Sequence, residues 1–99
     1  MTEQIKEDIR RIAEQIDAEL TPRPVLSNFA KLMEAKLRKN DHKTTWANLP
    51  VEALFRLLMV EIEEFKVAHE FLSVEEAQNE LIDVSNYCMI LHDRLGMKK

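Results

Sequence analysis

The fold is decided by residues 50–95, PVEALFRLLMVEIEEFKVAHEFLSVEEAQNELIDVSNYCMILHDRL, which hold two amphipathic helical segments joined by a short turn. Pro50 suits the first turn of a helix that continues to about Glu70. One face of this helix is apolar and comprises Leu54, Leu57, Leu58, Phe65 and Ala68. Ser73 and Glu76 have the spacing of a capping box, so a second helix starts there. That helix runs to about Leu95, and Gly96 supplies its stop. The segment therefore predicts a tight helical hairpin.

Two further helices are expected upstream of the hairpin. The first covers residues 2–20 and carries an apolar stripe at helical spacing, formed by Ile5, Ile9, Ile12, Ile16 and Leu20. Residues 21–24, Thr-Pro-Arg-Pro, interrupt it because a residue before proline avoids the helical region. The second runs from about Pro24 to Lys39, with an apolar face of Leu26, Phe29, Ala30, Met33 and Leu37. The polar residues 40–49 favour a loop.

The composition supports the same fold class. Of the 99 residues, 45% are hydrophobic and 32% are charged, which is typical of a globular chain. One glycine and three prolines leave too little turn chemistry for a sheet protein built from hairpins. We expect an all-α protein, a four-helix antiparallel bundle that forms a single domain over residues 1–99. Its N-terminal helix covers residues 2–20 and its catalytic core covers about residues 24–95.

Charge and hydropathy narrow the classes of partner. The net charge is −4 and no basic block is present, which argues against a nucleic acid polymer as the ligand. The longest apolar run, from Leu57 to Val60, is too short to span a bilayer, so no membrane partner is expected. The single cysteine, Cys88, excludes an internal disulfide. Because the charged start of the chain does not resemble a signal peptide, we expect a cytoplasmic protein.

Four acidic residues lie where the apolar faces of the hairpin should meet. Glu61 and Glu64 interrupt the apolar stripe of residues 50–70, whereas Glu63 lies on the solvated face. Glu80 and Asp83 repeat the arrangement on the next helix. One such pair alone is commonly a solvated surface pair, but two pairs on adjacent helices favour a common site. Buried carboxylates need a neutralising partner.

A divalent cation is the simplest partner for these acids. Neither interior stripe offers a lysine or arginine, apart from Arg94 near the C-terminal end. Four oxygen ligands suit Mg²⁺, with Mn²⁺ as a possible substitute. A di-iron bundle would need a Glu-x-x-His repeat, and neither His69 nor His92 has an acid three residues earlier. The acids therefore predict a magnesium site.

The acidic motifs resemble those of a known family. Glu61-Ile62-Glu63-Glu64 is followed, after fifteen residues, by Glu80-Leu81-Ile82-Asp83 and then by Asn86-Tyr87. Together with the upstream segment 36–46, which contains Trp46, this pattern resembles the MazG-like family of all-α nucleoside triphosphate pyrophosphohydrolases. The resemblance covers about residues 28–95.

The resemblance implies an activity and a ligand set. It makes Glu61, Glu64, Glu80 and Asp83 the Mg²⁺ ligands. The implied reaction is hydrolysis between the α- and β-phosphates of a nucleoside triphosphate, which yields a nucleoside monophosphate and pyrophosphate. Two departures matter. Val60 stands where the family often has an acid, so either fewer metal ions bind or another acid activates water. Thr44 and Thr45 replace small glycines before the tryptophan, which bears on base selection.

Several residues have predicted roles beside the metal ligands. Glu64, with Glu61, is predicted to be catalytic by orienting or deprotonating the attacking water. The predicted substrate-binding residues are Lys43, Trp46, Asn86, His42 and Tyr87. Each has a structural alternative: Lys43 and His42 as solvated loop residues, Trp46 as a loop anchor, and Asn86 as an interhelical contact. Tyr87 is expected to pack against the acids with its hydroxyl available to a ligand.

The helix of residues 73–95 has a second apolar side, formed by Leu81, Ile82 and Met89 with Ser85. A helix with apolar residues on both sides is normally buried on both sides. We therefore expect a homodimer or homotetramer. Two alternatives to the enzyme stay open: a nucleotide-binding relative without catalysis, and a helical module whose apolar faces dock partner helices.

Overall fold

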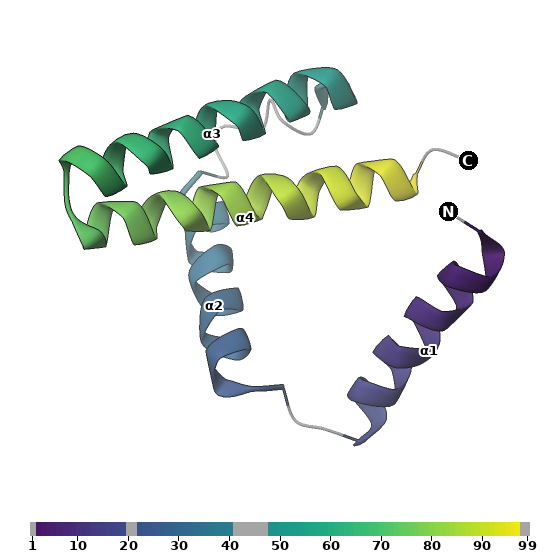
Figure 1. Ribbon diagram of the computed structural model, residues 1–99. Helices are drawn as coiled ribbons and strands as arrows, with labels where there is room; N and C mark the ends of the chain where they lie inside the picture. The colour runs from purple at the N-terminus through teal and green to yellow at the C-terminus, as the bar shows by residue number, and fades with distance from the viewer. Residues whose placement is uncertain (1, 20–21, 41–47, 98–99) are drawn as a thin grey trace. The chain divides into compact units, whose positions relative to one another are not determined.

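The computed structural model describes residues 2–19, 22–40 and 48–97, without the side chains of residues 17–19. The described residues form four α-helices and no strand, which confirms the all-α class (Figure 1). The helices are α1 (Glu3–Glu19), α2 (Pro24–Lys39), α3 (Val51–Phe71) and α4 (Val74–Gly96). Their bounds agree with the expected ones to within one residue, because helical periodicity and proline positions fix them locally.

The chain divides into two compact units, Met1–Ala30 and Lys31–Lys99, so that α2 crosses the boundary. The antiparallel pairing expected of a bundle is present for α3 and α4 in the second unit. Packing of all four helices into one bundle stays a prediction. None of the helices in the described ranges combines the length and the apolar composition that a membrane crossing requires.

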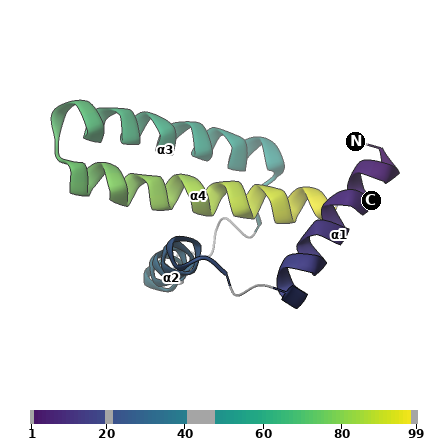
Figure 2. The same ribbon diagram turned by 60° about the horizontal axis from the view of Figure 1, so that its bottom comes forward.

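Helices α3 and α4 form the predicted hairpin and lie side by side in both views (Figures 1 and 2). At the open end of the hairpin, Leu54 is fully buried and packs with Ile90 and Leu91. Near the turn, the buried residues are the small Ala68 and Ala77. Glu61 and Glu64 of α3, and Glu80 and Asp83 of α4, lie in the sequence between these two apolar ends. The hairpin core is therefore interrupted in its middle by carboxylates.

The turn between α3 and α4 has the predicted cap. Ser73 Oγ accepts a hydrogen bond of 3.0 Å from the backbone N–H of Glu76. The backbone N–H of Leu72 donates to the carbonyl of Ala68, which satisfies an orphan acceptor at the end of α3. With only two residues between the helices, this turn fixes the register in which α3 and α4 face each other.

The expected role of Gly96 is wrong in detail. Gly96 is the last residue of α4 rather than the residue beyond it, and no described glycine has a positive φ. The helix instead ends in a tightened turn, in which the N–H of Met97 donates to the carbonyl of Arg94 at 3.1 Å. A left-handed cap is therefore not what terminates α4.

The C-terminal half of α2 attaches to α4 through polar contacts. Asn86 Nδ2 donates to the carbonyl of Met33 at 3.2 Å. Lys36 of the same helix reaches Asp83 and Asn79 one and two turns earlier on α4. These contacts place the C-terminal half of α2 beside the acidic middle of the hairpin.

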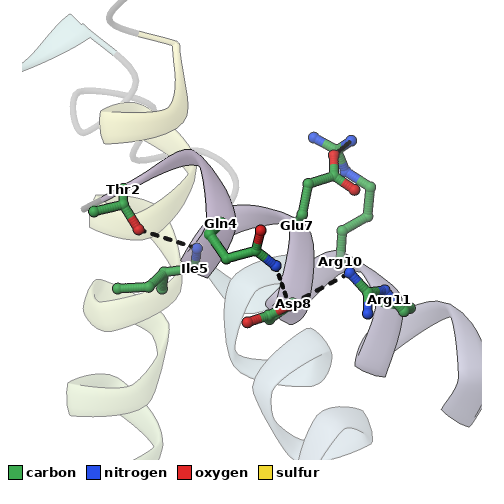
Figure 3. A network of polar contacts seen from close by, with 7 residues as sticks. All are labelled: Thr2, Gln4, Ile5, Glu7, Asp8, Arg10 and Arg11. Carbon is green, nitrogen blue, oxygen red and sulfur yellow. Dashed lines mark hydrogen bonds and ion pairs between the residues drawn. The ribbon is translucent and has the colours of Figure 1, made fainter.

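Helix α1 is an amphipathic helix whose polar side chains pair within the helix (Figure 3). Thr2 caps it by accepting from the N–H of Ile5 at 3.2 Å. Arg10 pairs with Glu7 at 2.7 Å, and Asp8 accepts from Gln4 at 3.0 Å. The predicted isoleucine stripe is exposed by 45–59% along its described members, Ile5, Ile9, Ile12 and Ile16. Most of the stability of an amphipathic helix comes from packing of its apolar face. We therefore expect the isoleucine stripe to pack against another apolar surface.

Candidate functional site

The structure brings three of the four predicted ligands together. Glu61 and Glu64 come from α3 and Glu80 comes from α4. One carboxylate oxygen from each lies within 4.8 Å of the other two. The i, i+3 spacing places the first two on one side of α3, and the short turn brings α4 back against that side. The acidic cluster, defined as Glu61, Glu64 and Glu80, thus depends on both local periodicity and hairpin register.

The three acids differ in exposure. Glu61 and Glu80 are half-buried, whereas Glu64 is exposed, as its position at the edge of the apolar sector predicts. Glu61 Oε2 and Glu80 Oε2 are buried, and neither finds a hydrogen-bond partner among the residues that the structure describes. Buried acceptors without donors are rare and costly. A bound cation or hydrogen-bond donor would therefore supply the polar partner that these two oxygens lack.

The electrostatics of the cluster reflect burial and mutual repulsion. Burial, followed by a hydrogen bond and the charge of Glu64, raises the pKa of Glu61 from 4.5 to about 8. Burial, together with the charges of Glu64 and Asp83, also raises the pKa of Glu80. Glu61 therefore keeps its proton at neutral pH. Protonation is one means by which these half-buried acids are tolerated.

Asp83 is neutralised differently. Lys36 Nζ lies 3.3 Å from Asp83 Oδ2 and donates to Asn79 Oδ1 at 3.1 Å. The side chains of Lys36 and Asp83 are 19% and 21% exposed, so the pair is largely sheltered. The hairpin stripes did not reveal this partner, because the lysine beside Asp83 comes from a third helix. This lysine follows Met33 by three residues and so shares its face on α2.

A cleft of about 450 Å³ opens beside Glu61 and Asp83. Its lining combines charged, polar and apolar side chains from the three helices α2, α3 and α4 and from the residues that follow α2 and precede Pro50. They are Lys36, Leu37, Asn40, Leu49, Leu57, Glu61, Asp83, Asn86, Tyr87 and Ile90. The cleft thus has both positively and negatively charged side chains beside apolar ones. Such a lining suits a ligand with a charged end and an apolar ring.

Two of the predicted substrate-binding residues line this cleft. Asn86 is only 5% exposed; its Nδ2 makes the interhelical contact with Met33, and its Oδ1 has no partner among the described residues. Tyr87 is half-buried and packs against the Leu54 core. Its pKa is raised by burial and then by the charges of Glu61 and Asp83, so its hydroxyl keeps its proton. These two residues thus offer the cleft one hydrogen-bond acceptor, Asn86 Oδ1, and one donor, the Tyr87 hydroxyl.

A second hollow of about 530 Å³ lies on the other border of the cluster. It is an apolar groove with acids among its lining residues, which are Met59, Val60, Glu63, Glu64, Val67, Ala68, Leu72 and Glu80. Val60, which departs from the resembled motif, lines this groove rather than the cleft. The acidic cluster therefore separates a mixed cleft from an apolar groove.

The remaining predicted substrate residues, His42, Lys43 and Trp46, lie outside the described residues. Arg94 Nη1 donates a hydrogen bond to the carbonyl of Leu49. That contact ties the end of α4 to the segment that enters α3. Neither Lys36 nor Asn79 was among the predicted site residues.

Fold and site together define a small all-helical protein with a carboxylate cluster across a helical hairpin. Sequence similarity to another protein shows which family the chain belongs to. The chain is 33% identical to an uncharacterized protein of Archaeoglobus fulgidus over 69 residues, which are 70% of this chain and 74% of that protein. The chain belongs to the same family as that archaeal protein. No protein-family model matches the chain, and no solved structure matches it.

Proposed function

We propose that the protein is a Mg²⁺-dependent nucleoside triphosphate pyrophosphohydrolase of the MazG-like kind, a hydrolase acting on phosphoric anhydrides. The observation that carries the proposal is the meeting of Glu61, Glu64 and Glu80 at no more than 4.8 Å, beside a cleft that also holds Asp83. The spacing of these acids in the sequence is the one that the MazG-like resemblance requires.

The donor set fits a hard divalent cation. All candidate ligands are carboxylate oxygens, which Mg²⁺ prefers, and Mn²⁺ accepts the same set. One carboxylate oxygen from each of Glu61, Glu64 and Glu80 lies within 4.8 Å of the other two, so these three residues would be the ones to hold the cation. The two unpartnered oxygens, Glu61 Oε2 and Glu80 Oε2, support the same assignment.

The residues would divide the work as follows. Glu61, Glu64, Glu80 and Asp83 hold the cation, which when bound screens the phosphate charge and lowers the pKa of a coordinated water. Glu64, as the exposed member, orients the attacking water and accepts its proton. Glu61 must release its own proton before it can ligate. Its raised pKa therefore couples cation binding to pH.

The cleft would receive the nucleotide. Because Asn86 Nδ2 is used by Met33, its Oδ1 is left to accept a hydrogen bond from a sugar hydroxyl or a base N–H. The protonated Tyr87 hydroxyl can donate to a phosphate or sugar oxygen. We assign Lys43 and His42 to phosphate contacts and Trp46 to base stacking from the sequence alone.

We further propose that the protein is a homodimer or homotetramer in solution. Support comes from apolar surface in both units. The isoleucine stripe of α1 is exposed, as are Leu81 and Met89 on the second apolar side of α4. Exposed apolar residues arranged as stripes normally mark an interface.

One observation favours the alternative of a helical interaction module. The apolar groove that includes Met59, Val60 and Val67 could hold a partner helix. Magnesium separates the two functions, because a ligand that binds the folded state raises its melting temperature. A rise in melting temperature with Mg²⁺ supports the metal site, whereas an unchanged melting temperature favours the module.

The direct test is incubation with ribo- and deoxyribonucleoside triphosphates and Mg²⁺, followed by chromatography of the products. A monophosphate and pyrophosphate are expected. A diphosphate and orthophosphate would contradict the proposed bond, and the absence of turnover across the panel would sink the enzyme assignment.

Site variants sharpen this test. Glu64→Gln and Asp83→Asn should each lower turnover at least about a hundredfold, since each removes a charged ligand. Their helical circular dichroism should be unchanged. Glu70→Gln, on an exposed position of the same helix as Glu64, is the matched control and should keep full activity. Full activity in Glu64→Gln or Asp83→Asn would remove that residue from the site.

A further inference from the structure

The contacts of Lys36 suggest a role that the acidic motif alone does not contain. Its ammonium lies between a charged acceptor, Asp83 Oδ2 at 3.3 Å, and a neutral one, Asn79 Oδ1 at 3.1 Å. Lys36 also lines the same cleft as Glu61, Asn86 and Tyr87. The amine is therefore at the border between the acids and the space proposed for the nucleotide.

We propose that Lys36 is an exchangeable counter-ion: it neutralises Asp83 in the metal-free protein and transfers to the phosphate chain of a bound nucleotide when a divalent cation takes Asp83. The inference rests on the proposed function and deepens it. It assigns to Lys36 the recognition of the phosphates rather than of the base or the sugar.

The exchange follows from charge balance. If Asp83 contacted both the Lys36 ammonium and a divalent cation, the two positive charges would lie close together and repel each other. Once the cation is bound, Lys36 keeps only the neutral Asn79 contact and lacks an anionic partner at Asp83. A triphosphate in the cleft brings new negative charge to that place. Before the cation and nucleotide bind, the charge of Lys36 is balanced by Asp83. After they bind, it is balanced by the phosphates.

The mechanics of lysine permit this exchange. Its ammonium is a compact charge on a flexible four-carbon stem, so it can turn over several ångströms while the backbone stays in place. Lys36 stands on α2, whereas all four acids stand on the hairpin. It therefore approaches the acids from the cleft side, and the Asn79 amide gives the amine a fixed point on α4 in the metal-free state.

A second observation supports a ligand in this cleft. Asn86 is nine-tenths buried or more, and its Oδ1, which belongs to a cleft-lining residue, is without a partner among the described residues. A ligand donor in the cleft would satisfy that oxygen. The cleft thus holds an ammonium group, on Lys36, that can change its anionic partner. It also holds a buried acceptor, Asn86 Oδ1, that lacks a hydrogen-bond donor among the described residues.

The test measures binding rather than turnover, in the intact 99-residue chain. Mn²⁺ binding without nucleotide is followed by titration with electron paramagnetic resonance, and binding of a non-hydrolysable α,β-methylene nucleoside triphosphate is followed by calorimetry at saturating Mn²⁺. Lys36→Met is compared with Lys31→Met, which removes an exposed lysine from the same helix. Circular dichroism checks folding, and Lys36→Gln serves in place of Lys36→Met should the latter misfold.

The two affinities should move in opposite directions. Without the competing ammonium, Lys36→Met should bind Mn²⁺ about two- to fivefold more tightly, as the loss of one sheltered ion pair implies. It should bind the analogue at least about tenfold more weakly, because a charged hydrogen bond is lost. Lys36→Arg should restore most of the analogue affinity, and Lys31→Met should match the wild type.

A parallel loss of both affinities would show a merely structural role and overturn the inference, as would an unchanged affinity for the analogue. If the wild type binds both Mn²⁺ and the analogue, and Lys36→Met binds them with the same affinities, the counter-ion role is refuted while the proposed function stands. Wild-type protein that binds neither Mn²⁺ nor the analogue refutes the proposed function, and the inference falls with it.

Discussion

The proton on Glu61 leads to a prediction about stability in the absence of metal. Between pH 4.5 and about 8, the folded protein keeps this proton while the unfolded chain releases it. The folded state therefore binds more protons in this range, and its stability falls as pH rises. The stabilising contribution is complete below pH 4.5 and is lost above about pH 8. Glu61→Gln, which is neutral at every pH, should escape this loss.

The magnitude follows from the pKa and the exposure of the side chain. A change of pKa from 4.5 to about 8 corresponds to at most about 5 kcal/mol, at ~1.4 kcal/mol per pH unit. Glu61 is only half-buried, so solvent screening reduces this to about 1–2 kcal/mol. For a domain of this size, that amounts to a melting temperature higher by roughly 4–16 °C in Glu61→Gln at pH 9.

The assay is thermal unfolding followed by circular dichroism at pH 5, 7 and 9, with a chelator and with Mg²⁺. With the chelator, Glu61→Gln and wild type should melt together at pH 5 and separate at pH 9. Mg²⁺ should reverse the order at pH 9, since the cation stabilises the ionised glutamate. Glu70→Gln should follow the wild type throughout. Equal melting temperatures of Glu61→Gln and wild type at every pH would refute the electrostatic reasoning.

Three further predictions concern packing, capping and association. Leu54→Ala empties the centre of the buried cluster and should cost about 2–5 kcal/mol, measured by urea unfolding; a cost below 1 kcal/mol would mean that Leu54 is not the packing centre. Ser73→Ala removes the acceptor for Glu76 and should cost about 1 kcal/mol in the same assay, with no loss contradicting the role of the cap. The double variant Ile9→Ser with Ile12→Ser should reduce the mass of the particle in analytical ultracentrifugation if α1 contributes to the oligomer; an unchanged mass would exclude the stripe from the interface.

Much of the fold was accessible from local patterns. Helix bounds depend on prolines, caps and a 3.6-residue period, all of which act over a few residues. The same period placed Glu61 and Glu80 inside the apolar faces and left Glu64 at an edge, in agreement with their exposure. The failure at Gly96 is also local, because a glycine near a helix end permits a left-handed cap without requiring one.

What the sequence by itself determined is the set of helices and the faces on which the acids lie, because both follow from spacing along one chain segment. Only the tertiary structure decided which charges meet. Lys36 and Asp83 are far apart in the sequence, and their ion pair exists because the C-terminal half of α2 contacts α4. The separation of the cleft from the apolar groove has the same origin. Helical periodicity carries no information on how one helix is placed against another, and that placement depends on side chains contributed by both.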